Sequence, residues 1–114
     1  MAANATATAL TRERLLDAIY GAMEELLDAG IRDDMVGIAA GGLQFLITGE
    51  DGERLSDSDL REMAAHEEGL AAILWADLRA SMQGFPGEED RRAAWITCDT
   101  IASAFAKSCT GGGR

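Results

Sequence analysis

Acidic side chains are the chemically most distinctive group in this sequence, and they cluster. Residues 50–68 contain eight carboxylates and two arginines, a net charge of −6, whereas the whole chain of 114 residues carries −10. Carboxylates a few ångströms apart attract basic groups and can imitate DNA phosphates, which follow one another about every 3.4 Å along each strand. We therefore predict that this segment binds a protein partner with a basic surface. The predicted contacts are Glu50, Asp51, Glu53, Asp57, Asp59, Glu62, Glu67 and Glu68.

A structural reason accounts for part of this acidity. Asp57 and Asp59 would lie in the first turn of a helix, where the helix dipole stabilises carboxylates. The other six acids would lie on a loop and on one side of a helix, where solvated carboxylates are common. The sequence is therefore compatible with a binding surface and equally with a face that only keeps the protein in solution.

Metal binding and catalysis are not predicted. The segment from Asp57 begins like a calcium-binding loop, but Arg61 occupies the position of the third ligand. His66 is the single histidine of the chain, so a zinc site lacks its usual ligands. Cys98 shares an apolar stripe with Phe105, which is typical of a core thiol with a raised pKa and not of a nucleophile. We expect no cofactor and no enzymatic activity.

The overall composition favours a small helical protein. Aromatic residues make up 5% of the chain and hydrophobic residues 47%, so the core must consist mainly of Leu, Ile, Met and Ala, which suit closely packed helices. The negative charge disfavours direct contact with nucleic acid or with anionic membranes. Residues 1–10 lack the pattern of a signal peptide, and no apolar run reaches the length of a membrane span, so we expect a cytoplasmic protein.

Apolar periodicity predicts an all-α bundle of about four helices. The expected helices cover residues 11–29, 35–48, 56–82 and 88–108, and glycine or proline separates several of them. The second helix is apolar on every side, so we expect it to be the central buried element. Its spacing of Gly37 and Gly41 would let another backbone approach closely. An alternative ends this helix early and forms a short hairpin within residues 43–55.

The last predicted helix carries a regular apolar seam. Trp95, Cys98, Ala102 and Phe105 follow one another at spacings of three and four residues, as in a coiled coil. Such a seam packs either inside the domain or against a second copy of the chain. We therefore consider these four residues candidates for self-association as a homodimer.

These observations predict one helical domain over residues 11–109, with mobile tails at 1–10 and 110–114. The expected function is that of an acidic binding protein that inhibits or regulates a basic, nucleic-acid-handling protein. Phage-encoded inhibitors, such as anti-CRISPR proteins and other charge mimics, are of this kind. The alternative is a homo-oligomeric assembly module whose acidity only maintains solubility.

Overall fold

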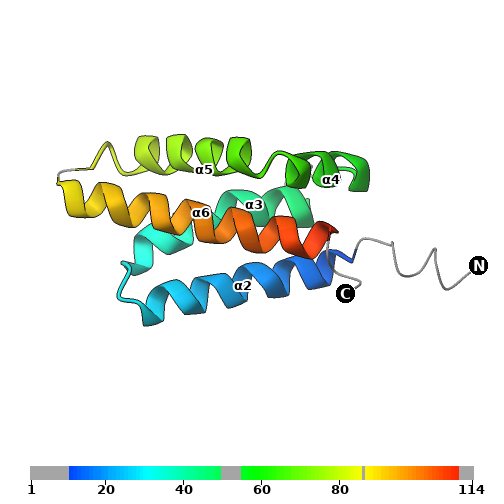
Figure 1. The fold of residues 1–114 in the computed structure, drawn as a ribbon, viewed down its shortest axis with the longest axis horizontal. Helices are drawn as coiled ribbons and strands as arrows, with labels where there is room; N and C mark the ends of the chain where they lie inside the picture. Colours follow the sequence, from blue (N-terminus) through cyan, green and yellow to red (C-terminus); the bar gives the residue numbers. More distant parts are fainter. Residues whose placement is uncertain (1–10, 50–54, 86, 111–114) are drawn as a thin grey trace, which may run out of the picture.

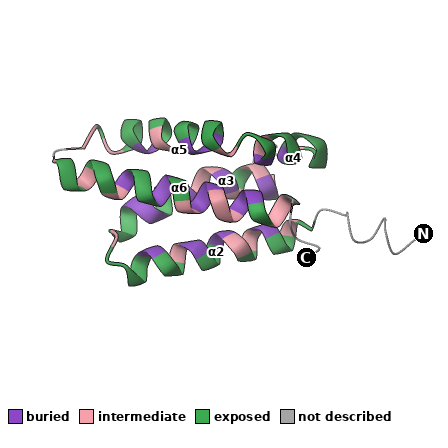
Figure 2. Cartoon of the chain, viewed as in Figure 1, coloured by how far each residue is buried: buried purple, intermediate pink, exposed green. Residues whose placement is uncertain are grey.

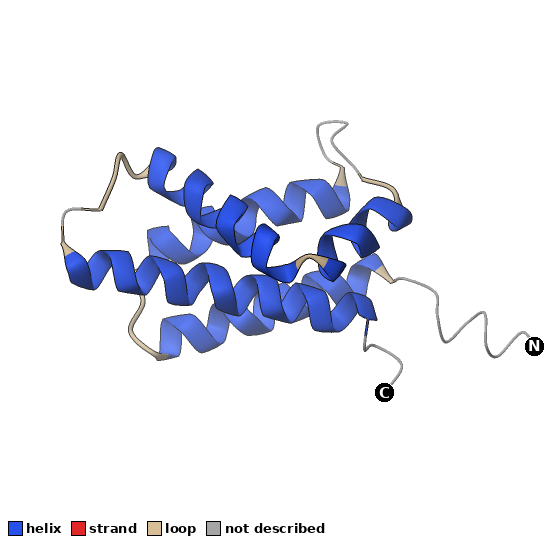
Figure 3. Cartoon of the chain, turned by 45° about the horizontal axis from the view of Figure 1, so that its top comes forward, coloured by secondary structure: helices blue, strands red, loops and turns tan. Residues whose placement is uncertain are grey.

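The computed structural model describes residues 11–49, 55–85 and 87–110, and within these ranges the chain forms a bundle of five α-helices (Figure 1). No strand occurs among the described residues (Figure 3), so the all-α prediction is confirmed. The predicted tail at 1–10 lies outside the described residues, as do residues 111–114 of the other tail. In chain order the helices are α2 (Arg12–Asp28), α3 (Asp33–Thr48), α4 (Asp57–Ala65), α5 (Glu67–Ser81) and α6 (Glu88–Thr110).

The first two helices form an α-hairpin that follows the sequence closely. Gly30 has a φ of +93°, a conformation that favours glycine because it has no Cβ. The amide of Gly30 donates to the carbonyl of Leu27, and that of Ile31 donates to the carbonyl of Leu26, both at 3.0 Å. This pair of hydrogen bonds is the Schellman motif, which satisfies the last carbonyls of a helix. The predicted end of the first helix near residue 29 is therefore confirmed.

The alternative hairpin within residues 43–55 is wrong for its described part. Helix α3 continues to Thr48 and ends at Gly49, whose φ of +75° again favours glycine. The amide of Leu55 donates to the carbonyl of Leu46 at 3.0 Å, which brings the chain back to α3 before α4 begins. Residues 50–54 lie outside the described residues.

The central helix is α6, which contacts each of the other four helices (Figure 1). This corrects the prediction that the helix at 35–48 is central and buried on every side. Helix α3 exposes Gly37, and 45% of the Phe45 side chain is accessible to solvent. Outside α3 itself, no described residue lies within 4 Å of a Cβ built on Gly37 or Gly41, so no other described backbone approaches them closely. The buried side chains of α6 are Ala94, Thr97, Cys98, Ile101, Ala102, Phe105 and Ala106.

The predicted helix at 56–82 is two helices, which is why the described bundle has five helices and not four. The break lies at His66, whose φ of −117° and ψ of 59° are not helical. In one continuous helix Glu67 would share the buried stripe of Leu60 and Ala71, because residues seven and four apart lie on the same face. Burying an unpaired carboxylate is costly, and the break leaves Glu67 half-exposed. Figure 2 shows that the two helices still bury their inner sides.

Candidate binding site between α4 and α5

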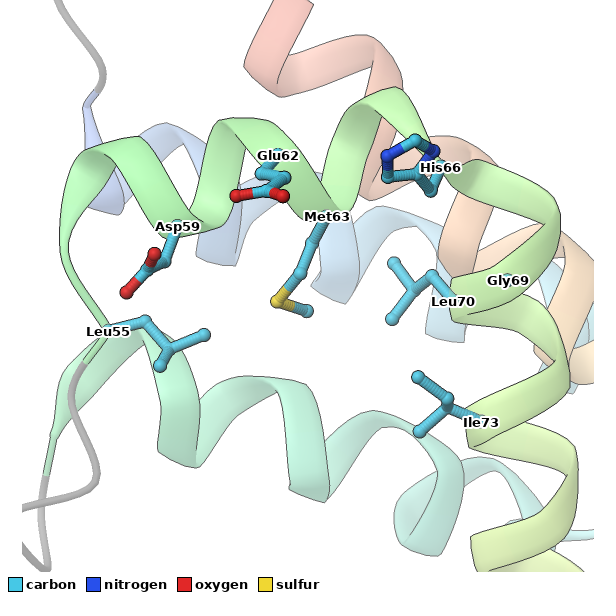
Figure 4. Close-up of a pocket in the computed structure, with 8 residues that line it drawn as sticks. All are labelled: Leu55, Asp59, Glu62, Met63, His66, Gly69, Leu70 and Ile73. Atoms are coloured by element: carbon cyan, nitrogen blue, oxygen red, sulfur yellow. The ribbon is translucent and has the colours of Figure 1, made fainter.

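The break at His66 creates a pocket of about 390 Å³ between α4 and α5. The two helices meet at an angle, and the side chains that line the pocket come from both of them and from the residues just before α4 (Figure 4). We call this hollow the α4–α5 pocket. It is lined by Leu55, Asp59, Glu62, Met63, His66, Gly69, Leu70 and Ile73.

Local capping fixes how α4 presents its side chains. The hydroxyl oxygen of Ser56 accepts a hydrogen bond from the amide of Asp59 at 3.1 Å and so caps the start of α4. Residues three and four positions apart lie on one side of a helix, so Asp59, Glu62 and Met63 share the side that lines the pocket. The start of α4 therefore sets the direction of the pocket's carboxylates.

Backbone hydrogen bonds hold the break itself in place. The amide of His66 donates to the carbonyl of Met63 at 3.1 Å, and the carbonyl of His66 accepts from the amide of Leu70 at 2.9 Å. His66 thus ends α4 and starts α5 with its polar backbone groups satisfied. These hydrogen bonds are of the kind found at ordinary helix ends. They fix the bend between α4 and α5 that forms the pocket.

The interior of the pocket is apolar. Leu70 is 4% exposed, and Leu55 and Met63 are half-buried, so these three side chains form the floor. Ile73 stands at one side with 66% of its surface accessible, the largest exposure of any large hydrophobic side chain in the described part of the chain. Figure 4 shows these four side chains gathered around the hollow. An aliphatic side chain this exposed gains free energy when a ligand covers it.

The rim of the pocket is acidic. Asp59 and Glu62 are both exposed, and they lie along α4 above the apolar side chains (Figure 4). His66 is exposed at the far end of α4. The site therefore combines an apolar floor with carboxylates at its edge, which suits a ligand that is itself apolar at one point and cationic nearby.

The structure brings together only some of the eight predicted partner contacts. Asp59 and Glu62 line the α4–α5 pocket, whereas Glu67 and Glu68 lie in the first turn of α5 and do not line it. Glu68 is exposed and Glu67 is half-buried. The remaining predicted loop contacts, Glu50, Asp51 and Glu53, lie outside the described residues.

Asp57 has a structural contact that the sequence analysis missed. Its carboxylate accepts from the guanidinium of Arg12 at 2.8 Å. The same guanidinium donates to the carbonyls of Ile47 at 2.8 Å and Leu55 at 2.6 Å. Arg12 thus joins the start of α2, the end of α3 and the residues before α4. Asp57 helps to hold the bundle together, beside the acidic rim.

Three of the four residues predicted for self-association lie inside the chain. Cys98, Ala102 and Phe105 are fully buried against the other helices, so their side chains form no surface that a second copy can contact. This corrects their prediction as an interface. Trp95 is 44% exposed and stacks on Trp75, with ring centroids 5.2 Å apart. The seam packs inside the domain because α6 is surrounded by four helices.

Burial also governs the two thiols. Burial raises the pKa of Cys98 to about 12, and the nearby Asp99 carboxylate acts in the same direction. Burial raises the pKa of Cys109 to about 11, with the Arg61 guanidinium acting in the opposite direction. A thiol that stays protonated at neutral pH is a poor nucleophile. The predicted rise in the pKa of Cys98 is confirmed in direction.

No group of three or more His, Cys, Asp or Glu side chains in the described ranges is placed to hold a metal ion. None of the described helices is both long enough and apolar enough to cross a membrane. Comparisons with protein-family models, with curated proteins and with solved structures find no match.

The sequence contained one signal for this pocket that the periodicity argument passed over. Glu67 interrupts an otherwise apolar stripe, and Ile73 adds an apolar position outside that stripe. A polar residue inside a stripe and an apolar residue outside it together indicate a change of helix direction. Read in this way, residues 57–81 predict two short helices with an apolar surface near their junction.

Proposed function

We propose that this chain is a non-enzymatic binding protein that engages a basic protein partner through the acidic rim of the α4–α5 pocket. One observation carries the proposal: Asp59 and Glu62 are exposed beside an apolar hollow, in a chain of net charge −10. Carboxylates at the edge of an interface steer a cationic partner toward it, and an apolar centre supplies affinity once the two have met.

The partner we propose is a cytoplasmic protein that handles nucleic acid. Such proteins carry basic grooves that recognise rows of phosphates. An acidic helix that occupies this kind of groove excludes the nucleic acid, so binding inhibits or regulates the partner. Phage-encoded inhibitors, including anti-CRISPR proteins, are examples of this mode of action. The chain's own charge opposes direct contact with nucleic acid.

Capture from a nuclease-treated bacterial lysate tests this function. The tagged chain is expected to retain a basic nucleic-acid-binding protein that is released by high salt and by added duplex DNA, because charge attraction is screened and the groove is shared. Glu62→Lys is expected to lower capture by tenfold or more. Glu24→Lys makes the same charge change on α2 and is expected to leave capture intact, since Glu24 is exposed away from the pocket. Equal capture by both variants contradicts the proposal.

A second candidate function, self-assembly, is favoured by a different surface. The side chains of Tyr20 and Phe45 are 52% and 45% exposed, and they border a groove of about 320 Å³ between α2 and α3. Among the described residues no charged side chain lines this groove, and Gly41 lies in it. An uncharged groove bordered by exposed aromatic side chains is a surface through which two copies of a strongly acidic chain can meet.

Analytical ultracentrifugation tests the second candidate. If the groove joins two copies, the wild-type chain is a dimer and Phe45→Ser is a monomer. The Ile96→Ser variant also removes an exposed apolar side chain, from α6, and is expected to stay dimeric. A wild-type chain that is monomeric at high concentration rules out self-assembly through this groove.

A further inference from the structure

We infer that the α4–α5 pocket receives one bulky apolar side chain from an amphipathic basic helix of the partner. Lysines or arginines one turn away on that helix contact Asp59 and Glu62. This inference rests on the proposed function and deepens it, because it assigns a chemistry to the partner segment. Its experiment separates failure of the anchor from failure of the acidic surface.

The floor of the pocket supports an apolar anchor. Met63 and Leu70 present only apolar atoms from their side chains, and Ile73 forms a wall that is two-thirds exposed. A volume of about 390 Å³ accommodates one large side chain such as Trp, Phe or Leu. The thioether of Met63 is flexible and polarisable, so it adapts to the shape of an aromatic or an aliphatic anchor.

The rim selects a cationic segment. A neutral apolar ligand would remove water from the Asp59 and Glu62 carboxylates without replacing the lost hydrogen bonds, which is unfavourable. A ligand with lysine or arginine beside its anchor restores those bonds with charge assistance. Charge complementarity therefore distinguishes a basic segment from a purely hydrophobic one.

Helical spacing matches the two parts of the site. Asp59 and Glu62 are three positions apart on α4, so they are about one turn of helix from each other. Two basic residues three or four positions apart on a partner helix lie at the same spacing from each other. The α4–α5 pocket is formed between two helices. In helix-in-groove recognition, an amphipathic partner helix places its apolar face in a groove of this kind.

Methyl NMR on the full chain tests the anchor directly. The protein is labelled at its Met and Ile methyl groups and titrated with a synthetic amphipathic helical peptide that carries lysines and one central Trp. The Met63 and Ile73 resonances are expected to shift, whereas the Ile96 resonance on α6 stays unchanged. The same peptide with Ser in place of Trp is expected to bind about tenfold more weakly or worse, as for a central interface residue.

A variant that fills the pocket without changing charge sharpens the test. A Cβ at Gly69 meets only the Cβ of His66, at 3.9 Å, an ordinary contact distance. Gly69→Leu is therefore expected to fold and to reduce binding of the Trp peptide to the level of the Ser peptide. Gly37→Leu is the matched control, because a Cβ there has nothing within 4 Å on the exposed side of α3. Circular dichroism on both variants verifies that the helices are intact.

The outcomes separate the two levels of the proposal. Equal binding of the Trp and Ser peptides overturns the anchor, and the acidic surface survives if Glu62→Lys still weakens binding. Binding that is insensitive to Glu62→Lys and to salt overturns the proposed function as well. Unchanged affinity for a Trp peptide whose lysines are replaced by glutamates overturns the requirement for a basic segment. Loss of binding in Gly69→Leu but not in Gly37→Leu supports the anchor.

Discussion

Helices α6 and α3 show that the most apolar segment of a small bundle need not be its central helix. Helix α3 has two aspartates at its start and is otherwise almost free of charge, whereas α6 contains charged residues at several positions. Yet α6 contacts all four other helices and buries Phe105 completely, and α3 leaves Phe45 nearly half exposed. The central position depends on how many helices a helix contacts, and among the five described helices it belongs to α6.

Glycine explains part of this difference. Gly37 and Gly41 lie along the outer side of α3, and neither contributes a side chain that could be buried. A second helix packed there would gain little apolar area from these positions. The buried side of α6 instead offers alanine, threonine and cysteine side chains, which are small enough for close packing and still fill space between helices.

Substitution of the two phenylalanines compares α6 with α3 directly, and it has the largest expected effect on stability. Phe105→Ala removes a fully buried ring and is expected to lower the free energy of unfolding by about 3–5 kcal/mol. Phe45→Ala removes a ring that is 45% exposed and is expected to cost about 1 kcal/mol or less. Urea denaturation monitored by circular dichroism measures both values. Losses of similar size would mean that the outer side of α3 is covered in solution.

The two cysteines of α6 test its burial by a second route. With the pKa of Cys98 near 12 and that of Cys109 near 11, almost no thiolate exists in the folded chain at pH 8. We expect a thiol reagent to react with the folded chain about a hundredfold more slowly than with the urea-unfolded chain, because the thiolate is the reacting form. Cys109 is partly accessible and should react first. Rapid labelling of Cys98 in the folded state would contradict the central position of α6.

The buried thiols of α6 also make the stability of the folded chain depend on pH. The pKa of Cys98 is higher in the folded chain than in the unfolded chain, where a thiol ionises near pH 9. Below that pH both states are protonated and the stability is unaffected. As the pH rises from about 9 toward 12, the unfolded state ionises first and is favoured. The free energy of unfolding, measured from denaturation curves, should therefore fall over this pH range more for the wild type than for Cys98→Ala.

A substitution of Arg12 tests whether polar contacts hold α3 in place, as packing holds α6. Its guanidinium is 19% exposed and donates to the Ile47 carbonyl at the end of α3 as well as to Leu55 and Asp57. Arg12→Met is expected to cost about 1–3 kcal/mol, because charged hydrogen bonds to partly buried carbonyls are lost. Arg32→Met removes an exposed ion pair to Asp34 and should change stability little. Thermal unfolding of the two variants side by side distinguishes these outcomes.

The helices could be predicted from the sequence because each carries its own local signals. Apolar periodicity and the glycine at position 30 placed α2, and the acids after Pro86 marked the start of α6. Which helix is central could not be predicted in this way. Periodicity shows which side of a helix is buried, but what buries that side depends on contacts between residues far apart in the sequence. The glycines of α3 were therefore assigned to the wrong environment, and the seam of α6 could not be assigned to one of its two possible environments.

The candidate site was predictable only in its charge. Asp59 and Glu62 were expected to be exposed acids, and the structure places both at one rim. The apolar floor was not expected, because it exists only when the chain turns at His66 and brings Leu70 and Ile73 toward Met63. The break at His66 therefore adds an apolar pocket to an acidic face.

Gly37 gives the smallest expected effect and tests what covers α3 in solution. It lies within α3, its φ is negative, and a Cβ there meets nothing within 4 Å. Gly37→Ala should therefore raise the free energy of unfolding by about 0.5–1 kcal/mol, because alanine loses less backbone entropy in a helix. Gly30→Ala is the opposing control, since its φ of +93° makes any side chain unfavourable. Differential scanning calorimetry resolves the two signs.

The sign of the Gly37→Ala effect also distinguishes the two candidate functions. In an isolated chain the added methyl group meets solvent, and only the gain in helix propensity is seen. If a second copy packs closely on the outer side of α3, the methyl group enters that contact, and overpacking reverses the sign. The variant would then be more stable than the wild type at low protein concentration and less stable at high concentration. That result would favour self-assembly through α3 over binding at the α4–α5 pocket. Stabilisation that is independent of concentration means that no second copy packs on the α3 surface at Gly37.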